Sequence, residues 1–185
     1  MSTRWRGCLL EIVETVLLTV VIFFVVHQFV LVDKLSPIFS DYKRGDVIVF
    51  TPPPGFQENG ADIPFIKRVI GTAGDLVEIH DDAVWVNGVK LVEPYVFEGQ
   101  PTTPTTGQAS WRVGPGELFV MGDHRQESQD SRAFGTIQKS TVIGRAWLRY
   151  WPISTLSFVG SASYPGVPNA SSVPSALPSP SPSAR

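Results

Sequence analysis

The stretch PFIKRVIG, Pro64–Gly71, places a lysine inside an otherwise apolar strand pattern. Alternation along a strand puts Phe65, Lys67 and Val69 on one face. If that face turns inward, the Lys67 ammonium lies among hydrocarbon, where burial disfavours its charged form. A lysine in such a position can act as a general base. The alternative from this stretch alone is an edge strand whose two cations, Lys67 and Arg68, discourage pairing with other sheets.

Short apolar runs separated by Gly and Pro continue on both sides of this strand. Asn87-Gly88, which lies between two valines, predicts a two-residue hairpin. No long amphipathic helix follows, so we predict a mainly β fold, an antiparallel β domain with closed or sandwiched sheets. Besides the lysine strand, the expected strands are Gly45–Phe50, Gly74–His80, Ala83–Leu91, Gly116–Asp123 and Thr141–Pro152.

The N-terminal apolar run, Cys8–Val32, predicts one transmembrane helix. Its acidic residues, Glu11 and Glu14, fall near one end, and its centre carries no charge. A cleaved signal peptide, which would release a secreted β domain, is the alternative. The run is long for a signal peptide and no small-x-small cleavage site follows it, so an uncleaved anchor is favoured. Arg4 and Arg6 favour a cytoplasmic N-terminus, but basic residues also follow the run, and charge alone leaves the orientation open.

The composition argues against several classes of function. The net charge is -2 and the basic residues are scattered, so no nucleic-acid binding is predicted. The single cysteine, Cys8, excludes an internal disulfide. The three histidines, His27, His80 and His124, lack metal-ligand spacing, so no metal site is predicted. Residues 161–185 are rich in Ser, Pro and Ala and are predicted to be disordered, because they bury too little apolar surface to offset ordering entropy.

Two motifs point to a family. Met121–Gly135 carries the pattern G-D-x-R-x-x-S-x-D-S-R-x-F-G, and Ile66–Asp75 carries I-K-R-V-I-G-x-x-G-D. Together they resemble bacterial type I signal peptidases, and the resemblance runs from about Cys8 to Pro152. It implies a membrane-anchored serine endopeptidase that removes signal peptides from exported pre-proteins, after small residues, by Ser/Lys-dyad acyl transfer.

The resemblance also implies roles for individual residues. Lys67 matches the general base, which takes a proton from a catalytic serine without a metal or an organic cofactor. Its pKa would have to fall from about 10.4 toward about 7 to 8 for this work. Ser128 would hydrogen-bond Lys67 and orient it. Asp130 and Arg132 would form a pair that holds the loop, and Asp123 would support this pair.

The same resemblance implies an organisation of the chain. The expected parts are a cytoplasmic N-terminus (residues 1–7), a transmembrane anchor (8–32), an extracytoplasmic β-rich peptidase-like domain (33–160) and the tail (161–185). The protein would therefore lie in the cell membrane as a single-pass protein. Its partners would be the signal peptides of pre-proteins and the lipid bilayer.

The nucleophile expected from the resemblance is missing. In the family the serine lies in a motif like S-M-x-P-T-L, but neither methionine of this chain, Met1 or Met121, follows a serine. A segment is absent near the Val30–Leu31 junction, and Ser36 and Ser40 match positions downstream of the nucleophile. The nucleophile is therefore unknown, and the chain is expected to be inactive or impaired. The alternative function is a non-catalytic, membrane-anchored protein that binds extended peptides by strand addition.

Overall fold

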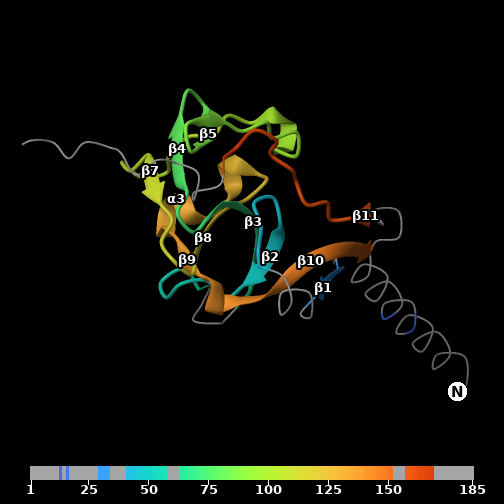
Figure 1. Cartoon of the computed structure of the whole chain (residues 1–185). Coiled ribbons are helices and arrows are strands. Elements are labelled where there is room, and N and C mark those ends of the chain that lie inside the picture. Colours follow the sequence, from blue (N-terminus) through green and yellow to red (C-terminus); the bar gives the residue numbers. More distant parts are fainter. Residues whose placement is uncertain are drawn as a thin grey trace, which may run out of the picture.

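A computed structural model describes residues 13, 16, 29–33, 41–57, 63–151 and 157–168 of the 185-residue chain. Strands dominate these residues and form two sheets (Figure 1). Every strand pairing among the described residues is antiparallel. The predicted mainly β, antiparallel fold is therefore confirmed.

The larger sheet has the strand order β1-β10-β2-β3-β8-β9, with β11 paired to β10 outside this path. It curls, so that β2, β3, β8 and β9 lie around one interior (Figure 1). The lysine strand is β3, which lies between β2 and β8 and is therefore not an edge strand of this sheet. The bounds are β1 (Phe29–Asp33), β2 (Val47–Phe50), β3 (Phe65–Thr72), β8 (Glu117–Met121), β9 (Ile137–Gln138), β10 (Val142–Trp151) and β11 (Ser157–Phe158).

The smaller sheet has the order β6-β5-β4-β7 and lies beside one end of the larger sheet (Figure 1). The predicted hairpin joins β5 to β6, because Val86 pairs with Val89. The two residues of its turn, Asn87 and Gly88, have φ angles of 53° and 77°, which suit a tight hairpin. The strands are β4 (Leu76–His80), β5 (Ala83–Val86), β6 (Val89–Lys90) and β7 (Ser110–Arg112).

Helical structure in the described residues beyond the first strand is limited to short turns. Three of these turns follow β8 and carry or flank the polar motif. Through these turns, Asp130 and Ser131 contact the backbone at the end of β8. The turns are the 3-10 helices η2 (Phe97–Gly99), η3 (Arg125–Glu127) and η4 (Lys139–Thr141) and the α-helix α3 (Ser131–Phe134).

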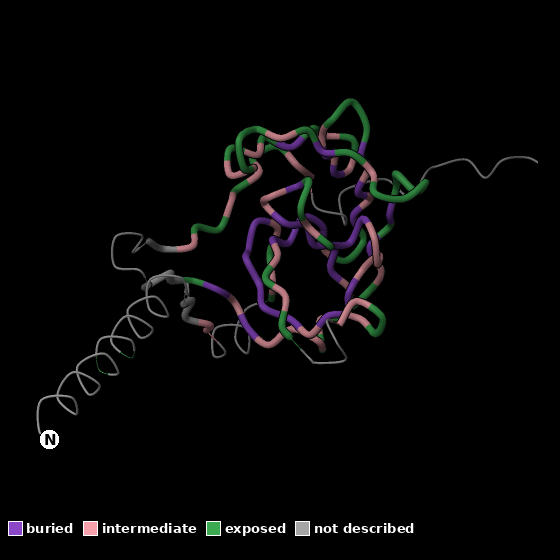
Figure 2. The backbone as a smooth tube through the Cα atoms, turned by 180° about the vertical axis from the view of Figure 1, so that it is seen from behind, coloured by how far each residue is buried: buried purple, intermediate pink, exposed green. Residues whose placement is uncertain are grey.

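Two apolar clusters hold the sheets together, and β3 contributes to both. Val69 belongs to the barrel core, inside the curled sheet, and Ile70 belongs to the inter-sheet core, between the two sheets. Buried backbone therefore runs through the strands of both sheets (Figure 2). The buried members of the barrel core are Ile48, Phe50, Val69, Leu118, Val120 and Ile137. Those of the inter-sheet core are Ile70, Val77, Ile79, Val84, Val86, Leu91, Trp111, Val113, Phe119 and Met121.

The structure corrects the prediction for the N-terminal run at its end. Phe29–Asp33 form β1 and pair with β10, so the helix predicted for Cys8–Val32 does not extend to Val32. The β-branched valines in this segment suit a strand. Among the described residues, no helix has the length and apolar character needed to cross a membrane. Apart from positions 13 and 16, residues 8–28 lie outside the described part of the chain.

The C-terminal strap, residues 157–168, crosses from the larger sheet to the smaller one. It starts as β11 beside β10, and the Ala162 N–H then donates to the Gly45 carbonyl at 3.1 Å. At its end the Arg44 guanidinium donates to the carbonyls of Val167 and Pro168, at 3.3 Å and 2.9 Å. The prediction of disorder from Ser161 onward is therefore wrong for residues 161–168. Residues 169–185 lie outside the described part.

Gly45 sets how closely the strap approaches the sheet. Its φ is +92°, and a Cβ there would lie 1.9 Å from the Ala162 carbonyl oxygen. We expect Gly45→Ala to reduce the unfolding free energy by roughly 1–3 kcal/mol more than Gly55→Ala, because the strap has to move. Gly55 is the matched control, since its φ is +90° and a Cβ there would meet nothing within 4 Å.

Urea unfolding of the two variants measures this difference, and hydrogen exchange at the Ala162 amide reports on the strap directly. Faster exchange in Gly45→Ala alone is the expected result. Equal stability loss and equal exchange in both variants would mean that the strap is not packed against Gly45.

Candidate active site

Lys67 lies on the inward face of β3, as the alternation predicts. Its neighbours on that face, Phe65 and Val69, both pack in or against the barrel core, and it pairs across to the buried Ile48 of β2. The side chain is partly buried, with Nζ 5.3 Å from the centroid of the Phe65 ring. The amine therefore lies at the rim of an apolar cluster.

This environment changes the protonation of Lys67. Burial lowers the pKa of the Lys67 amine below its ordinary value of 10.5. The positive charge of Arg132 acts in the same direction, whereas the carboxylates of Asp130 and Asp123 oppose it. Burial is the largest of these effects, so at a given pH a larger fraction of the amine is neutral than in an exposed lysine.

Lys67 and Ser128 converge on Gly122. A Cβ placed on Gly122 would lie 2.1 Å from Ser128 Oγ and 3.6 Å from Lys67 Nζ. Ser128 Oγ is buried and makes no hydrogen bond to any described residue. The predicted hydrogen bond between Lys67 and Ser128 is therefore not formed in this structure, although both side chains border the same glycine.

The predicted pair of Asp130 and Arg132 is present and buried. Arg132 donates through Nε and Nη2 to the two carboxylate oxygens of Asp130, both at 2.8 Å. Asp130 is 0% exposed and Arg132 2% exposed. The same carboxylate accepts the Gly122 N–H at 3.0 Å and the Arg132 N–H at 3.1 Å, which caps α3. The pair thus fixes Gly122 on its N–H side.

Asp123 has a different partner from the one predicted. Arg68 donates to both of its carboxylate oxygens, at 2.9 Å and 2.7 Å, so Asp123 holds β3 rather than the Asp130–Arg132 pair. Arg68 also donates to the carbonyls of Gly45 and Gly160. Because Arg68 follows Lys67 and points to the other face of β3, these bonds fix the strand next to the candidate base.

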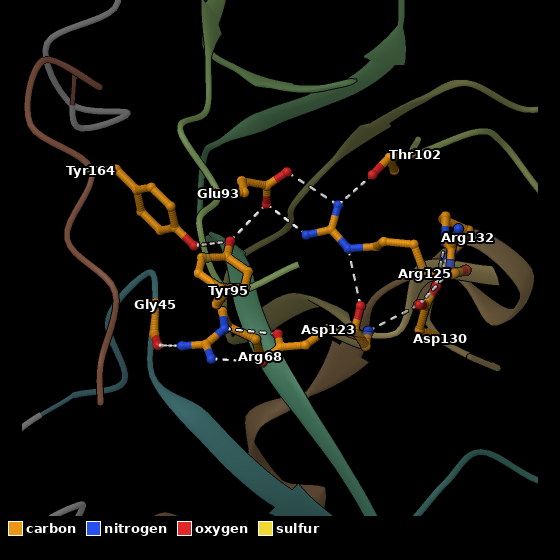
Figure 3. Close-up of polar contacts among 11 residues, drawn as sticks. Gly45, Arg68, Glu93, Tyr95, Thr102, Asp123, Arg125, Asp130, Arg132 and Tyr164 are labelled. Carbon is orange, nitrogen blue, oxygen red and sulfur yellow. Dashed lines mark hydrogen bonds and ion pairs between the residues drawn. The ribbon is translucent and has the colours of Figure 1, made fainter. Parts of the chain in front are cut away.

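Arg125 is a buried residue of the site that sequence reasoning did not single out (Figure 3). It is 1% exposed and donates through Nε to the Gly122 carbonyl at 3.0 Å. Its other nitrogens bind Glu93 and Thr102. Both polar groups of the Gly122 backbone are therefore held by buried charges. The available signal for Arg125 was its place as the first arginine of the motif G-D-x-R-x-x-S-x-D-S-R-x-F-G, to which no role was assigned.

A small cavity borders β3 at Ile66–Arg68. This cavity of about 180 Å³ is lined by Val47, Ile66, Lys67, Arg68 and Asp123. Strand β8 pairs with β3 only from Arg68 onward, so in the described part of the chain Phe65–Lys67 have no strand partner on the β8 side. This edge offers an extended peptide free backbone groups with which to pair as a strand beside Lys67.

Ser36 and Ser40 lie outside the described residues. No group of three or more His, Cys, Asp and Glu side chains within the described ranges is arranged to hold a metal ion. His80 instead contacts Asp81, and His124 contacts Glu127.

We expect Gly122→Ala to disrupt the meeting of Lys67 and Ser128, because the new methyl group would overlap Ser128. The overlap should reduce the unfolding free energy by roughly 1–3 kcal/mol. Gly107→Ala is the matched control, since a Cβ at Gly107 would meet nothing within 4 Å, and it should stay within about 0.5 kcal/mol of the parent.

Urea unfolding measures both effects. Adding Ser128→Gly to Gly122→Ala removes the overlapping atoms and should recover part of the loss. If Gly122→Ala is as stable as Gly107→Ala, Ser128 does not pack against this glycine.

Lys67 should destabilise the fold at neutral pH, because burial disfavours the charged form of the amine, which the unfolded chain carries there at no such cost. Its folded pKa is lowered, so between that pKa and 10.5 the unfolded chain binds more protons, and stability rises with pH across this window. We expect Lys67→Met to be more stable than the parent at pH about 7. Its unfolding free energy should also rise less between neutral pH and pH 10.5 than that of the parent.

Urea unfolding at several pH values, with the exposed Lys90→Met as the control, checks this expectation. A Lys67→Met protein that is less stable than the parent at neutral pH would show that the ammonium is favourably bound.

Known proteins were compared with the chain. The model of the signal peptidase family, peptidase S26, matches residues 10–151. A probable signal peptidase I-1 of Synechocystis sp. is 38% identical over 135 residues, which cover 72% of this chain and 67% of that protein. Signal peptidase IB of Staphylococcus aureus (strain MRSA252) is 31% identical over 178 residues, which cover 81% of this chain and 93% of that protein.

A crystal structure of a signal peptidase I from Enterococcus faecalis V583 has 30% sequence identity and a TM-score of 0.45, and the match covers 57% of this chain and 97% of that one. The chain spans 67%, 66% and 57% of the length of three signal peptidase I relatives from Synechocystis sp. and Leptolyngbya laminosa. On the extent of the family-model match and the identity to these relatives, the chain belongs to the signal peptidase family, peptidase S26.

Proposed function

We propose that this protein acts on the signal peptides of exported pre-proteins, as its relatives' names indicate for them, with Lys67 as the general base. The observation that carries the proposal is the Lys67 amine, which lies against Gly122 next to the buried Ser128 hydroxyl and whose pKa is lowered by burial. A neutral amine can accept the proton of an attacking hydroxyl and later donate it to the leaving amine.

The other site residues take supporting roles in this proposal. In this proposal Ser128 orients the Lys67 amine, since its hydroxyl and the amine both border Gly122. The Asp130–Arg132 pair fixes the loop, and the Asp123–Arg68 pair fixes β3. None of these residues needs to contact the substrate. Their work is to hold the amine in place beside Gly122.

The nucleophile limits the activity that we propose. Ser128 Oγ is buried, so a substrate carbonyl has no access to it. Loss of a nucleophile typically lowers turnover on the order of a millionfold, the figure measured in subtilisin. We infer that the chain is inactive or impaired, because its sequence lacks the serine motif, whose segment would also have supplied the oxyanion donors.

The proposed substrates are extended peptides with small residues before the cleavage site. The unpaired edge of Phe65–Lys67 supports the extended form of the substrate, because a peptide can add there as a strand beside Lys67. The proposed location is the cell membrane, with one N-terminal anchor, a cytoplasmic N-terminus and the β domain outside the cytoplasm. The apolar run Cys8–Val32, of which the part up to residue 28 fits an anchor, supports this location.

A second candidate function is a non-catalytic, membrane-anchored protein that holds extended peptides. The same open edge favours it, since strand addition needs no nucleophile. The two candidates differ in one respect: only the peptidase should gain activity when a serine motif is restored.

Restoring the serine motif tests the proposal. Val30 and Leu31 lie inside β1, so an inserted serine-motif segment placed directly before Phe29 leaves the pairing of β1 with β10 intact. We expect the full-length chain with this insert to cleave a pre-protein, and the parent to release no product above background. Gel analysis of the processed pre-protein measures both.

Two controls make the result specific. The same insert with its serine changed to alanine, and the insert combined with Lys67→Met, should both lack activity. If the insert is inactive although the protein is folded, Lys67 is not a general base. If the parent itself cleaves and loses activity on Ser36→Ala or Ser40→Ala, one of those serines is the nucleophile.

A further inference from the structure

A chain of polar groups, half-buried at the strap and buried at Arg125, leads from the C-terminal strap toward the candidate site (Figure 3). Its first member is Tyr164 of the strap, whose ring packs against the inter-sheet core and whose hydroxyl meets the Tyr95 hydroxyl. The Tyr95 hydroxyl donates to Glu93 Oε1 at 2.6 Å. Since Tyr95 uses its only proton on Glu93, Tyr164 is the donor to Tyr95.

These donors keep their protons at physiological pH. Burial raises the pKa of Tyr164 to about 12. Burial and the charge of Glu93 raise the pKa of Tyr95 further. The two hydroxyl groups therefore act in series, from Tyr164 to Tyr95 and from Tyr95 to the Glu93 carboxylate.

Glu93 connects the two tyrosines to the loop of the candidate site. Its two oxygens accept from Arg125 Nη2 at 2.6 Å and Nη1 at 3.1 Å, and Arg125 Nε holds the Gly122 carbonyl. Arg132 donates to the Arg125 carbonyl at 2.6 Å. The chain therefore ends at the glycine on which Lys67 and Ser128 converge.

Tyr95 also connects the chain to β3. Its ring lies 4.0 Å from the guanidinium carbon of Arg68, and Arg68 binds both Asp123 and the strap carbonyl of Gly160. The strap thus touches both walls of the site, the loop through Glu93 and the strand through Arg68. Loss of the hydrogen bond between Tyr164 and Tyr95 would therefore loosen both the loop and the strand.

We propose that Tyr164 is a positioning residue: its hydroxyl, acting through Tyr95, Glu93 and Arg125, holds the Gly122 loop over Lys67. This inference rests on the proposed function, in which Lys67 is the general base. It assigns to the strap a part in setting the environment of the amine, in addition to covering the inter-sheet core.

The test measures the protonation of Lys67 and not catalysis. The full-length chain in detergent is labelled with a trace of an amine-reactive anhydride between about pH 6 and pH 11, and mass spectrometry quantifies the Lys67 peptide. Tyr164→Phe removes one hydroxyl and keeps the ring. We expect the midpoint of Lys67 labelling to rise by about half a pH unit or more, because a loosened loop admits water to the amine.

The controls separate positioning from a general loss of structure. Tyr95→Phe should raise the midpoint as well, and the double variant should add nothing, because both residues act in one chain. Tyr42→Phe, on a tyrosine that packs against the barrel core instead, should leave the midpoint unchanged.

An unchanged Lys67 midpoint in folded Tyr164→Phe and in folded Tyr95→Phe would overturn the inference, even if both variants melt at a lower temperature. The charged groups facing Lys67 (Asp123, Asp130 and Arg132) are the same in every variant, so the comparison reports on position alone. Since no cleavage is measured, this result is independent of whether the restored serine motif gives a peptidase.

Discussion

The buried ion pair between Asp130 and Arg132 is the interaction on which the candidate site depends. One carboxylate accepts two guanidinium nitrogens, the Gly122 N–H and the N–H that starts α3. Removing one partner from such a pair typically costs about 3–5 kcal/mol, because the other charge is left buried and unpaired. The loop after β8 therefore has one low-energy arrangement, and Gly122 lies where that arrangement places it.

The parts of the fold that follow from local chemistry could be predicted from the sequence. The Asn87-Gly88 turn, the alternation that turns Lys67 inward, and the pairing of Asp130 with Arg132 each depend on residues close together in the chain. The sheet order and the partners across it depend on contacts between distant residues, which no local pattern encodes. Strand content was therefore more predictable than topology.

The misses have the same origin. Asp123 was expected beside its neighbours in the motif, but Arg68, which is far away in sequence, supplies the better bidentate partner. The strap was expected to be disordered, because its composition is poor in large apolar residues. One tyrosine and a few backbone carbonyls that meet Arg44 and Arg68 are enough to hold it. The apolar end of the N-terminal run fits a helix and a strand equally well, and β10 decides for the strand.

The position of the strap has a consequence for the order in which the protein assembles. Chains emerge from the ribosome N-terminus first, and domains fold as units once their parts are available. Strand β10 and the strap carry the last described residues, yet they supply partners to β1, β2, Gly45 and Arg68. The walls around Lys67 are therefore completed only after β10 and the strap, which follow the other strands in the chain, have been synthesised.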